Sequence, residues 1–551
     1  MLYNCKSQFI NWIPTTKKSR RYENPYELDK ILNFMINQMK KLVPKSIVML
    51  AVFGFSTIAN AQTITPKIQE YVNNHQTVLL NQFIEFLRIP NVLGDSLNME
   101  RNASFIQQML KERAVKTRLL RSNQPGSAPV VYGEVLTPGA TTTIIFYAHY
   151  DGQPVNPAKW EKGLHPFEPK LYSNRLDLGG KPLSMPTQNN LWDPEWRVYA
   201  RGAADDKAGV FAIIAAYEAI RELALKPLVN IKFFFEGEEE AGSTNLGQIL
   251  EENKALLKSD LWLICDGPSH FTGKKQILFG VRGDVNIDLK VYASKRPLHS
   301  GNYGNWAPNP AMRLAQLLAS MKDKNGMVTI KGFYDDVTPL TATEKKAIAK
   351  IPKVESILSK DLLMINPDGG GQPFMELLNL PTLNINGMQS ANIGNLSANI
   401  IPTEAEAALD LRLVKGNTVE RQIDKIVRHV KSEGYHVIDH EPTDEERITF
   451  PLLVKIIKRG RGYNAQRTAM DLPIAQRVVK AVNRTIDYEL IQVPSLGGSL
   501  PLYLFEEILN TKPITIPIVN FDNNQHAENE NVKIGNLMKG IETIAAIMLM
   551  D

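Results

Sequence analysis

Residues 144–152 read IIFYAHYDG, an apolar run that stops abruptly at a histidine, a tyrosine and an aspartate. Such a run predicts a strand buried on both faces, as in a parallel sheet. Similar runs lie at 129–135, 230–236 and 260–265, and residues 208–223 between them have a helical pattern. Strands that alternate with helices predict an α/β domain with a mostly parallel sheet, which binds ligands beyond the carboxyl ends of its strands.

The pattern changes near residue 283. Residues 285–293 and 400–413 alternate in the manner of antiparallel strands, and residues 310–321 and 419–433 are helical. We therefore predict that a small α+β domain interrupts the α/β domain. The predicted boundaries are residues 62–282 and 442–551 for the two parts of the catalytic domain and residues 283–441 for the insertion.

The positive charge of the chain is concentrated at its start. The formal net charge is +5, but residues 1–61 hold nine Lys/Arg against three Asp/Glu, so the remaining chain is close to neutral. A neutral body gives no support for a polyanionic partner, and we expect no binding to nucleic acid.

A targeting signal explains this charge. A basic region that begins at Met39 precedes the apolar run IVMLAVFGF at 47–55, and the small residues of 59–61 follow. This order predicts a cleavable secretory signal at 39–61, and therefore an exported protein. Residues 1–38 would then be an upstream extension of the reading frame.

The chain contains two cysteines, Cys5 and Cys265. Because Cys5 lies before the predicted cleavage site, the mature protein would have one thiol and no internal disulfide. Cys265 follows the apolar run 261–264 and is predicted to be a buried core residue. The apolar part of the signal is too short for a permanent membrane helix, so we expect no stable membrane insertion.

Five short clusters carry residues suited to metal chemistry. They are HYDG (149–152), YARGAADDKAG (199–209), FFFEGEEEAGS (233–243), LWLICDGP (261–268) and NNQHAENEN (523–531). Each alone has an ordinary interpretation, such as a helix N-cap or a solvated loop. Together they place two histidines and several carboxylates at the ends of predicted strands, which suits zinc or a similar divalent ion. The number of acids favours two metals that share a bridging carboxylate.

In this order the clusters resemble the M20 metallopeptidases, over nearly all of residues 65–551. The segments EGEEEAGS and GGSLP resemble those of the carnosinase-like, non-specific dipeptidase branch. The resemblance implies an α/β dimetal hydrolase domain with a mostly parallel sheet, and an inserted α+β domain that serves as a lid and forms a homodimer. It also implies two divalent ions, with zinc expected and manganese or cobalt as alternatives.

The resemblance further implies two metal positions. His149 and Asp266 would bind the first ion, Glu240 and His526 would bind the second, and Asp205 would bridge the two.

The resemblance assigns catalytic roles to three other residues. Glu239 would be the general base, and Asp151 would adjust His149. The additional acid Glu238 leaves a shift of one position open within EGEEEAGS. His299, in RPLHSG, would reach the active site of the partner subunit and stabilise the oxyanion.

Substrate binding is implied at two further places. Arg412, in LDLRL, would bind the carboxylate of the substrate through bidentate hydrogen bonds. Gly498 and Ser499, in the segment GGSLP, would contact the substrate.

The sequence thus predicts an exported hydrolase that cleaves the amide bonds of dipeptides or short peptides with metal-activated water. Two alternatives stay open. The first is an N-acyl-amino-acid deacylase or desuccinylase of the same family. The second is a non-catalytic binding protein on this fold, which the complete set of ligand positions disfavours.

Overall fold

The computed structural model describes residues 66–187, 192–498 and 500–551. Three predictions fall outside these residues: the reading-frame extension at 1–38, the signal peptide at 39–61 and the substrate contact of Ser499. Among the described helices, none combines the length and the apolar character that crossing a bilayer requires.

An eight-stranded sheet forms the framework of the site. Its order is β1 (Lys116–Leu120), β2 (Val130–Val135), β7 (Asn230–Glu236), β3 (Thr143–His149), β8 (Leu261–Ile264), β20 (Pro513–Thr515), β9 (Gln276–Leu278) and β19 (Ile491–Val493). The central strand β3 runs parallel to β7 on one side and to β8 on the other. β20 continues in parallel beside β8. The predicted α/β fold with a mostly parallel sheet is confirmed.

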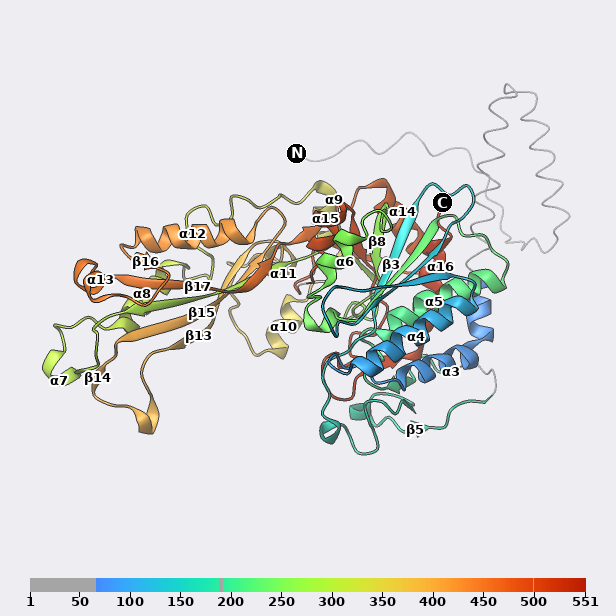
Figure 1. Cartoon of the computed structure of the whole chain (residues 1–551), viewed down its shortest axis with the longest axis horizontal. Helices are drawn as coiled ribbons and strands as arrows, with labels where there is room; N and C mark the ends of the chain where they lie inside the picture. The colour runs from blue at the N-terminus through green and yellow to red at the C-terminus, as the bar shows by residue number, and fades with distance from the viewer. Residues whose placement is uncertain (1–65, 188–191, 499) are drawn as a thin grey trace, which may run out of the picture. The chain divides into compact units, whose positions relative to one another are not determined.

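Helices cover both faces of this sheet. Successive residues of a strand point to opposite sides, so the apolar strands present apolar side chains on both faces. On β7, Phe233 packs edge-on against Tyr217 of α5 (Lys207–Glu222). The next residue, Phe234, packs against Trp262, which contacts Phe505 of α15 (Tyr503–Leu509). Helix α16 (Ile534–Met548) lies against α5 (Figure 1). The helices on the two faces bury the apolar residues of β3, β7 and β8.

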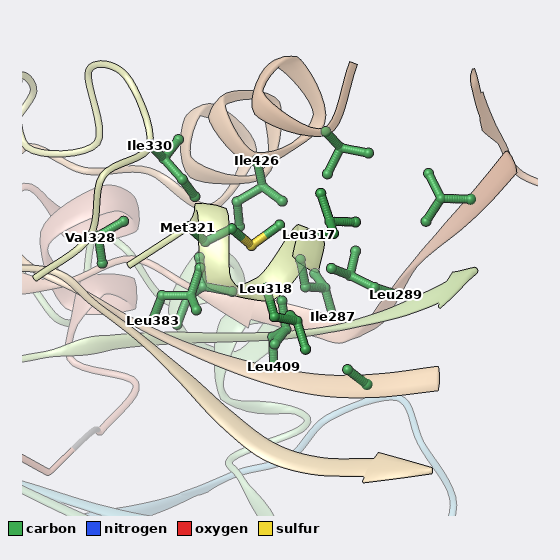
Figure 2. Packing of buried hydrophobic residues seen from close by; sticks show 14 of the residues in the cluster. Ile287, Leu289, Leu317, Leu318, Met321, Val328, Ile330, Leu383, Leu409 and Ile426 are labelled. Carbon is green, nitrogen blue, oxygen red and sulfur yellow. The ribbon is translucent and has the colours of Figure 1, made fainter. Parts of the chain in front are cut away.

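A second sheet of five strands has the order β13 (Thr382–Gln389), β15 (Glu404–Leu413), β11 (Gly283–Tyr292), β17 (Leu453–Tyr463) and β16 (His436–Ile438). Buried and partly exposed residues alternate along β11, so its apolar residues face one side. Helices α8 (Pro310–Ser320) and α12 (Val419–Ser432) cover that side. Figure 2 shows Leu317 and Leu318 of α8, and Ile426 of α12, packed over Ile287 and Leu409 of the sheet.

This mostly antiparallel sheet, in which only β16 and β17 pair in parallel among the described strands, continues past residue 441, where we expected the inserted domain to end. β17 pairs with β11 over residues 453–463, and its Val454 and Ile456 pack into the same hydrophobic core. The segment that returns the chain to the large sheet therefore starts after Tyr463.

A small four-stranded sheet brings distant loops together. Its order is β21 (Asn531–Lys533), β6 (Arg197–Tyr199), β4 (Lys170–Tyr172) and β5 (Pro182–Leu183). Residues 531–533 pair with β6, and the last helix starts at Ile534. This pairing places the loop after β6 beside the loop before β21, although more than 300 residues separate them.

Candidate metal centre

The carboxyl end of β3 positions His149 and Asp151. Both side chains are fully buried. The carboxylate of Asp151 accepts hydrogen bonds from the backbone N–H groups of Glu239, at 3.2 Å, and Glu240, at 3.0 Å. One of its oxygens lies 3.3 Å from His149 Nδ1. Asp151 therefore orients the imidazole and fixes the turn that carries the two glutamates.

The loop between β6 and α5 presents Asp205. The conformation of this loop is held by Glu530, a fully buried carboxylate in the loop before β21. Glu530 accepts hydrogen bonds from Arg201 Nη1 (2.7 Å) and from the backbone N–H groups of Gly202 (3.1 Å), Ala204 (2.8 Å) and Asp205 (2.9 Å). The neighbouring Asp206 caps α5 by accepting a hydrogen bond from the backbone N–H of Gly209. Only Asp205 of the acidic pair is thus directed to the candidate centre.

The four glutamates of EGEEEAGS have different surroundings. Glu236 accepts a hydrogen bond from Tyr147 Oη at 2.7 Å, inside the large-sheet core. Glu238 accepts hydrogen bonds from the backbone N–H of Ala128 (2.9 Å) and from Asn245 Nδ2 (2.8 Å). Glu239 and Glu240 instead line a cavity. Because Glu238 has structural partners, the geometry favours the register in which Glu239 and Glu240 are the functional pair.

Two groups of ligand atoms meet at Asp205. His149, Asp205 and Asp266 place one ligand atom each within 4.8 Å of one another, and so do Asp205, Glu240 and His526. His149 Nε2 lies 2.9 Å from Asp205 Oδ1, and His526 Nε2 lies 3.0 Å from Asp205 Oδ2. The structure therefore brings together all five predicted metal ligands, with one carboxylate shared between the two groups. The role of each residue stays a prediction.

Burial and mutual repulsion perturb the acids of this cluster. Burial, increased by repulsion from Asp205, raises the pKa of Glu240 to about 7 and that of Asp266 to about 6. Burial also raises the pKa of Glu239. Burial alone would raise the pKa of Asp205 as well, but hydrogen bonds with His149 and His526 hold it below its usual range. A divalent cation would relieve this repulsion.

The cluster opens into a cavity of about 840 Å³. The sequence analysis did not single out several of the residues that line it: Gln153, Arg461, Tyr463, Tyr503, Leu504 and Gln525. Gln153 donates a hydrogen bond to Glu240 Oε2 at 2.8 Å, and Tyr463 stacks on Tyr503 with 6.0 Å between ring centroids. The sequence offered one signal for these residues, since Gln153 follows HYDG directly. Arg461 and Tyr463 gave no such signal, because they belong to the other sheet.

Three predicted residues lie elsewhere among the described parts of the chain. His299 is exposed, and its Nδ1 accepts a hydrogen bond from the backbone N–H of Gly301. The Nε atom of Arg412 lies 3.2 Å from Asp410 Oδ1 and 3.5 Å from Asp284 Oδ1. Neither these two residues nor Gly498 belongs to the cavity lining, although Leu500 and Pro501 of the GGSLP segment do. Cys265 is fully buried, as predicted.

Comparison with known proteins extends over most of the chain. Residues 145–550 match the model of a family described as peptidase family M20/M25/M40. The human Beta-Ala-His dipeptidase is 25% identical over 517 residues, which cover 90% of this chain and 94% of the human protein. The Cys-Gly metallodipeptidase dug1 of Schizosaccharomyces pombe is 24% identical, with 75% of this chain and 81% of the yeast protein covered.

Solved structures give the same result. An M20 family metallo-carboxypeptidase from Sulfolobus solfataricus superimposes with a TM-score of 0.65 and 27% identity, covering 86% of this chain and 98% of the other. Human carnosine dipeptidase 1 shares the fold, with a TM-score of 0.62 and 24% identity, over 88% of this chain and 98% of the human chain.

Proposed function

This chain belongs to peptidase family M20/M25/M40 and is a metallopeptidase, and we propose that it hydrolyses dipeptides and other short peptides with two divalent metal ions. One observation carries the proposal: two ligand groups, each with one histidine and two carboxylates, share Asp205. A shared carboxylate is the usual way in which two ions are held close enough to act on one bond.

The residues present fit such ions. In the part of the chain that the structure describes, Asp266 Oδ1 is buried without a hydrogen-bond partner. A buried carboxylate oxygen without a partner is costly unless a cation compensates it. The mixture of imidazole and carboxylate donors suits zinc, which we propose as the native ion, and also suits manganese or cobalt. Bound ions would polarise the scissile carbonyl and lower the pKa of a water molecule.

Glu239 is our candidate for the proton-transfer group. Its backbone N–H donates to Asp151, which fixes the start of the side chain beside His149. Its carboxylate oxygen lies 3.9 Å from His149 Nε2 and faces the cavity. A carboxylate placed there can take a proton from the attacking water and deliver it to the leaving amine. His149 and Asp205 would keep their positions during both transfers, because buried hydrogen bonds hold them.

The substrate assignment is supported by the relatives and by the cavity. Two similar proteins are named as dipeptidases for Beta-Ala-His and for Cys-Gly. The cavity combines the acidic cluster with Tyr463, Tyr503 and Leu504, so it offers apolar and aromatic surface beside the reacting groups. A short peptide can place its bond at the ions and its side chains against that surface.

We further propose a homodimer formed through the five-stranded sheet. β13 lies at the edge of this sheet, and its Ile385 and Met388 are 37% and 53% exposed. An exposed edge strand with apolar side chains is suited to pairing with another chain. In such a dimer His299 of the partner subunit would complete the active site. Sedimentation analysis of the wild type and of Met388→Asp tests this proposal, and a monomeric wild type would contradict it.

Export is also proposed, on the signal-like sequence at residues 39–61. Expression of the full chain, followed by cell fractionation and N-terminal sequencing, tests it. We expect a mature protein that begins at Gln62. An uncleaved cytoplasmic chain would contradict export and leave the peptidase assignment unchanged.

The enzymatic proposal is tested on protein that begins at Gln62 and is loaded with zinc, manganese or cobalt. Its hydrolysis of Ala-Leu, β-Ala-His and Cys-Gly is compared with that of N-acetyl-leucine and N-succinyl-leucine. We expect dipeptide hydrolysis and a loss of about 10²- to 10⁴-fold in Glu239→Gln, the usual contribution of an acid–base group. Preference for the N-acyl amino acids would favour the deacylase alternative, and absence of both metal and hydrolysis would contradict the enzyme.

A further inference from the structure

The second predicted metal position depends on an exposed histidine. The side chain of His526 is 56% exposed, whereas that of His149, which belongs to the first position, is 1% exposed. His526 also has a φ of +62°, in the left-handed region that residues with a side chain rarely adopt. Burial in the core therefore does little to hold this ligand, and its position depends on the conformation of its loop.

A buried arginine closes this loop. Arg197, on β6, is 1% exposed. Its Nη2 donates a hydrogen bond to Asp522 Oδ2 at 2.8 Å, and its Nη1 donates to the backbone oxygen of Asp522 at 3.2 Å. The same Nη1 donates to Asn531 Oδ1 at 2.7 Å. One guanidinium thus binds both ends of the segment 522–531, which carries His526 between them.

Hydrogen bonds continue from these ends toward the histidine. The backbone N–H of Asn531 donates to the backbone oxygen of Asn523 at 2.8 Å, and its Nδ2 donates to the same oxygen at 3.3 Å. Asn523 Oδ1 accepts a hydrogen bond from the backbone N–H of Gln525 at 2.7 Å. Because Gln525 directly precedes His526, a continuous series of hydrogen bonds joins Arg197 to the backbone beside this ligand.

The result of this arrangement is the geometry of the second position. His526 Nε2 lies 3.0 Å from Asp205 Oδ2 and 3.3 Å from Glu240 Oε2. Without Arg197, the buried Oδ1 of Asn531 would lose its charged donor, and leaving a buried acceptor unpaired is costly. The loop would then relax, and His526 would move away from the two carboxylates.

The hydrogen bonds of Arg197 are confined to this loop. In the part of the chain that the structure describes, its guanidinium donates to Asp522 and Asn531 and to no other residue. Different contacts hold the first metal position, where Asp151 lies beside the buried His149. Loss of Arg197 should therefore disturb the second position and spare the first.

We infer that Arg197 is a positioning residue for the second metal ion, because it closes the loop that keeps His526 beside Asp205 and Glu240. The inference rests on the proposed function and adds to it a residue outside the five sequence clusters. Arg197 contacts neither of the predicted metal positions and acts through His526. Contacts that orient a metal ligand typically contribute about 10- to 100-fold to metal affinity.

The test measures the affinity for each ion without turnover. Apo protein is titrated with zinc in competition with a chromophoric chelator, which yields two stepwise dissociation constants. We expect Arg197→Met to weaken the second position by about 10- to 100-fold and to leave the first unchanged. Arg197→Lys should restore little, because a single ammonium lacks the planar fork that binds both ends of the loop. Arg175→Met, which removes a partly exposed arginine 3.4 Å from Asp522 Oδ2, is the matched control and should change neither constant.

A double-mutant cycle separates positioning from a general loss of stability. His526→Ala removes the ligand directly and identifies the constant that belongs to the second position. Arg197→Met added to His526→Ala should cost little further affinity, because Arg197 acts through that histidine. Asp522→Asn keeps the shape of its side chain and should weaken the same constant by a smaller factor. This variant decides the matter if Arg197→Met does not fold.

The outcomes separate the two proposals. Equal losses at both positions, unchanged constants in Arg197→Met, or full additivity with His526→Ala would overturn the role of Arg197. If Arg197→Met does not fold, an unchanged second constant in Asp522→Asn overturns it. A wild type that holds fewer than two ions contradicts both proposals. A wild type that holds two zinc ions but cleaves none of Ala-Leu, β-Ala-His and Cys-Gly overturns the proposed function alone, because the titrations do not require turnover.

Discussion

The eight-stranded and five-stranded sheets of this molecule use acidic side chains in opposite ways. At the carboxyl edge of the eight-stranded sheet, Asp151 and Glu530 are fully buried and accept several hydrogen bonds from backbone N–H groups. In the five-stranded sheet, Asp284 and Asp410 are partly exposed and share the guanidinium of Arg412. The first arrangement fixes positions precisely, and the second leaves its charges responsive to solvent and pH.

We expect this difference to separate chemistry from selectivity. Metal ligands must keep their geometry within a fraction of an ångström, and a rigid, buried loop framework provides that. Recognition of a substrate group requires an accessible side chain, and the exposed Arg461 of β17 lines the cavity from the five-stranded sheet. Variants of the large sheet should therefore change metal content and turnover, whereas variants of the five-stranded sheet should change preference and pH response.

The largest effect is expected at the shared ligand. Asp205→Asn removes the charge to which both histidines are paired. We expect the protein to lose at least one ion. Loss of a residue that only orients a metal ligand reduces activity roughly 10- to 100-fold, and we expect hydrolysis to fall by more than that. Plasma emission spectrometry and kcat/KM measure the two effects. Asp177→Asn, which removes an exposed carboxylate paired with Arg175, is the control. Two tightly held ions in Asp205→Asn would disprove the shared centre.

The next effect is expected at the residue that holds the Asp205 loop. Glu530→Gln keeps the shape of the side chain but removes the charge that Arg201 and the loop N–H groups bind. We expect metal affinity to fall about 10- to 100-fold, measured by calorimetry on the apo protein. Glu528→Gln, at a partly exposed position in the same loop, should leave the metal affinity unchanged. Equal affinities in the two variants would show that the loop does not need Glu530.

Much of the large-sheet site could be predicted because its residues follow apolar strands directly. His149 and Asp266 come at the ends of β3 and β8, and parallel strand ends meet at one edge of a sheet. The choice of Glu239 came from the resemblance and left Glu238 open, because the surroundings that distinguish the two depend on Ala128 and Asn245, which belong to other segments.

The five-stranded sheet was harder to predict from the sequence. The backbone irregularity at RGRGY depends on how β17 aligns with β11, because a register shift exists only relative to a partner strand. Glu530 lies in the quoted cluster NNQHAENEN, yet nothing local distinguishes it from the partly exposed Glu528. Only the pairing of β21 with β6 buries it against the Asp205 loop.

A smaller effect is expected at Asp522, in the same loop as His526. Burial alone would raise the pKa of Asp522, but hydrogen bonds from Arg197 and Asn520 lower it to about 2. Because the folded pKa lies below the ordinary value, the stabilisation is complete above about pH 4 and is lost as the pH falls to 2. Asp522→Asn should lower the free energy of unfolding by about 2 kcal/mol at pH 7, and by less at pH 3. Denaturant titrations at both pH values measure this difference. A loss of stability of the same size at pH 7 and pH 3 would exclude the ion pair as its cause.

The smallest effect, with the opposite sign, is expected at Asp284. Burial, and then a hydrogen bond shared with Asp410, raises the pKa of Asp284 to about 6. The folded state therefore holds this proton more tightly than the unfolded chain does, and the stabilisation that is complete below about pH 4 is lost as the pH rises through 6. Asp284→Asn cannot ionise, so its stability relative to the wild type should rise by roughly 1 kcal/mol between pH 4 and pH 7, after allowance for partial exposure. Asp288→Asn, on the same strand, is the matched control. Asp522→Asn should lose stability relative to the wild type as the pH rises from 2 to 4. If Asp284→Asn likewise lost stability relative to the wild type as the pH rises from 4 to 7, the two sheets would not differ in how they hold their acids.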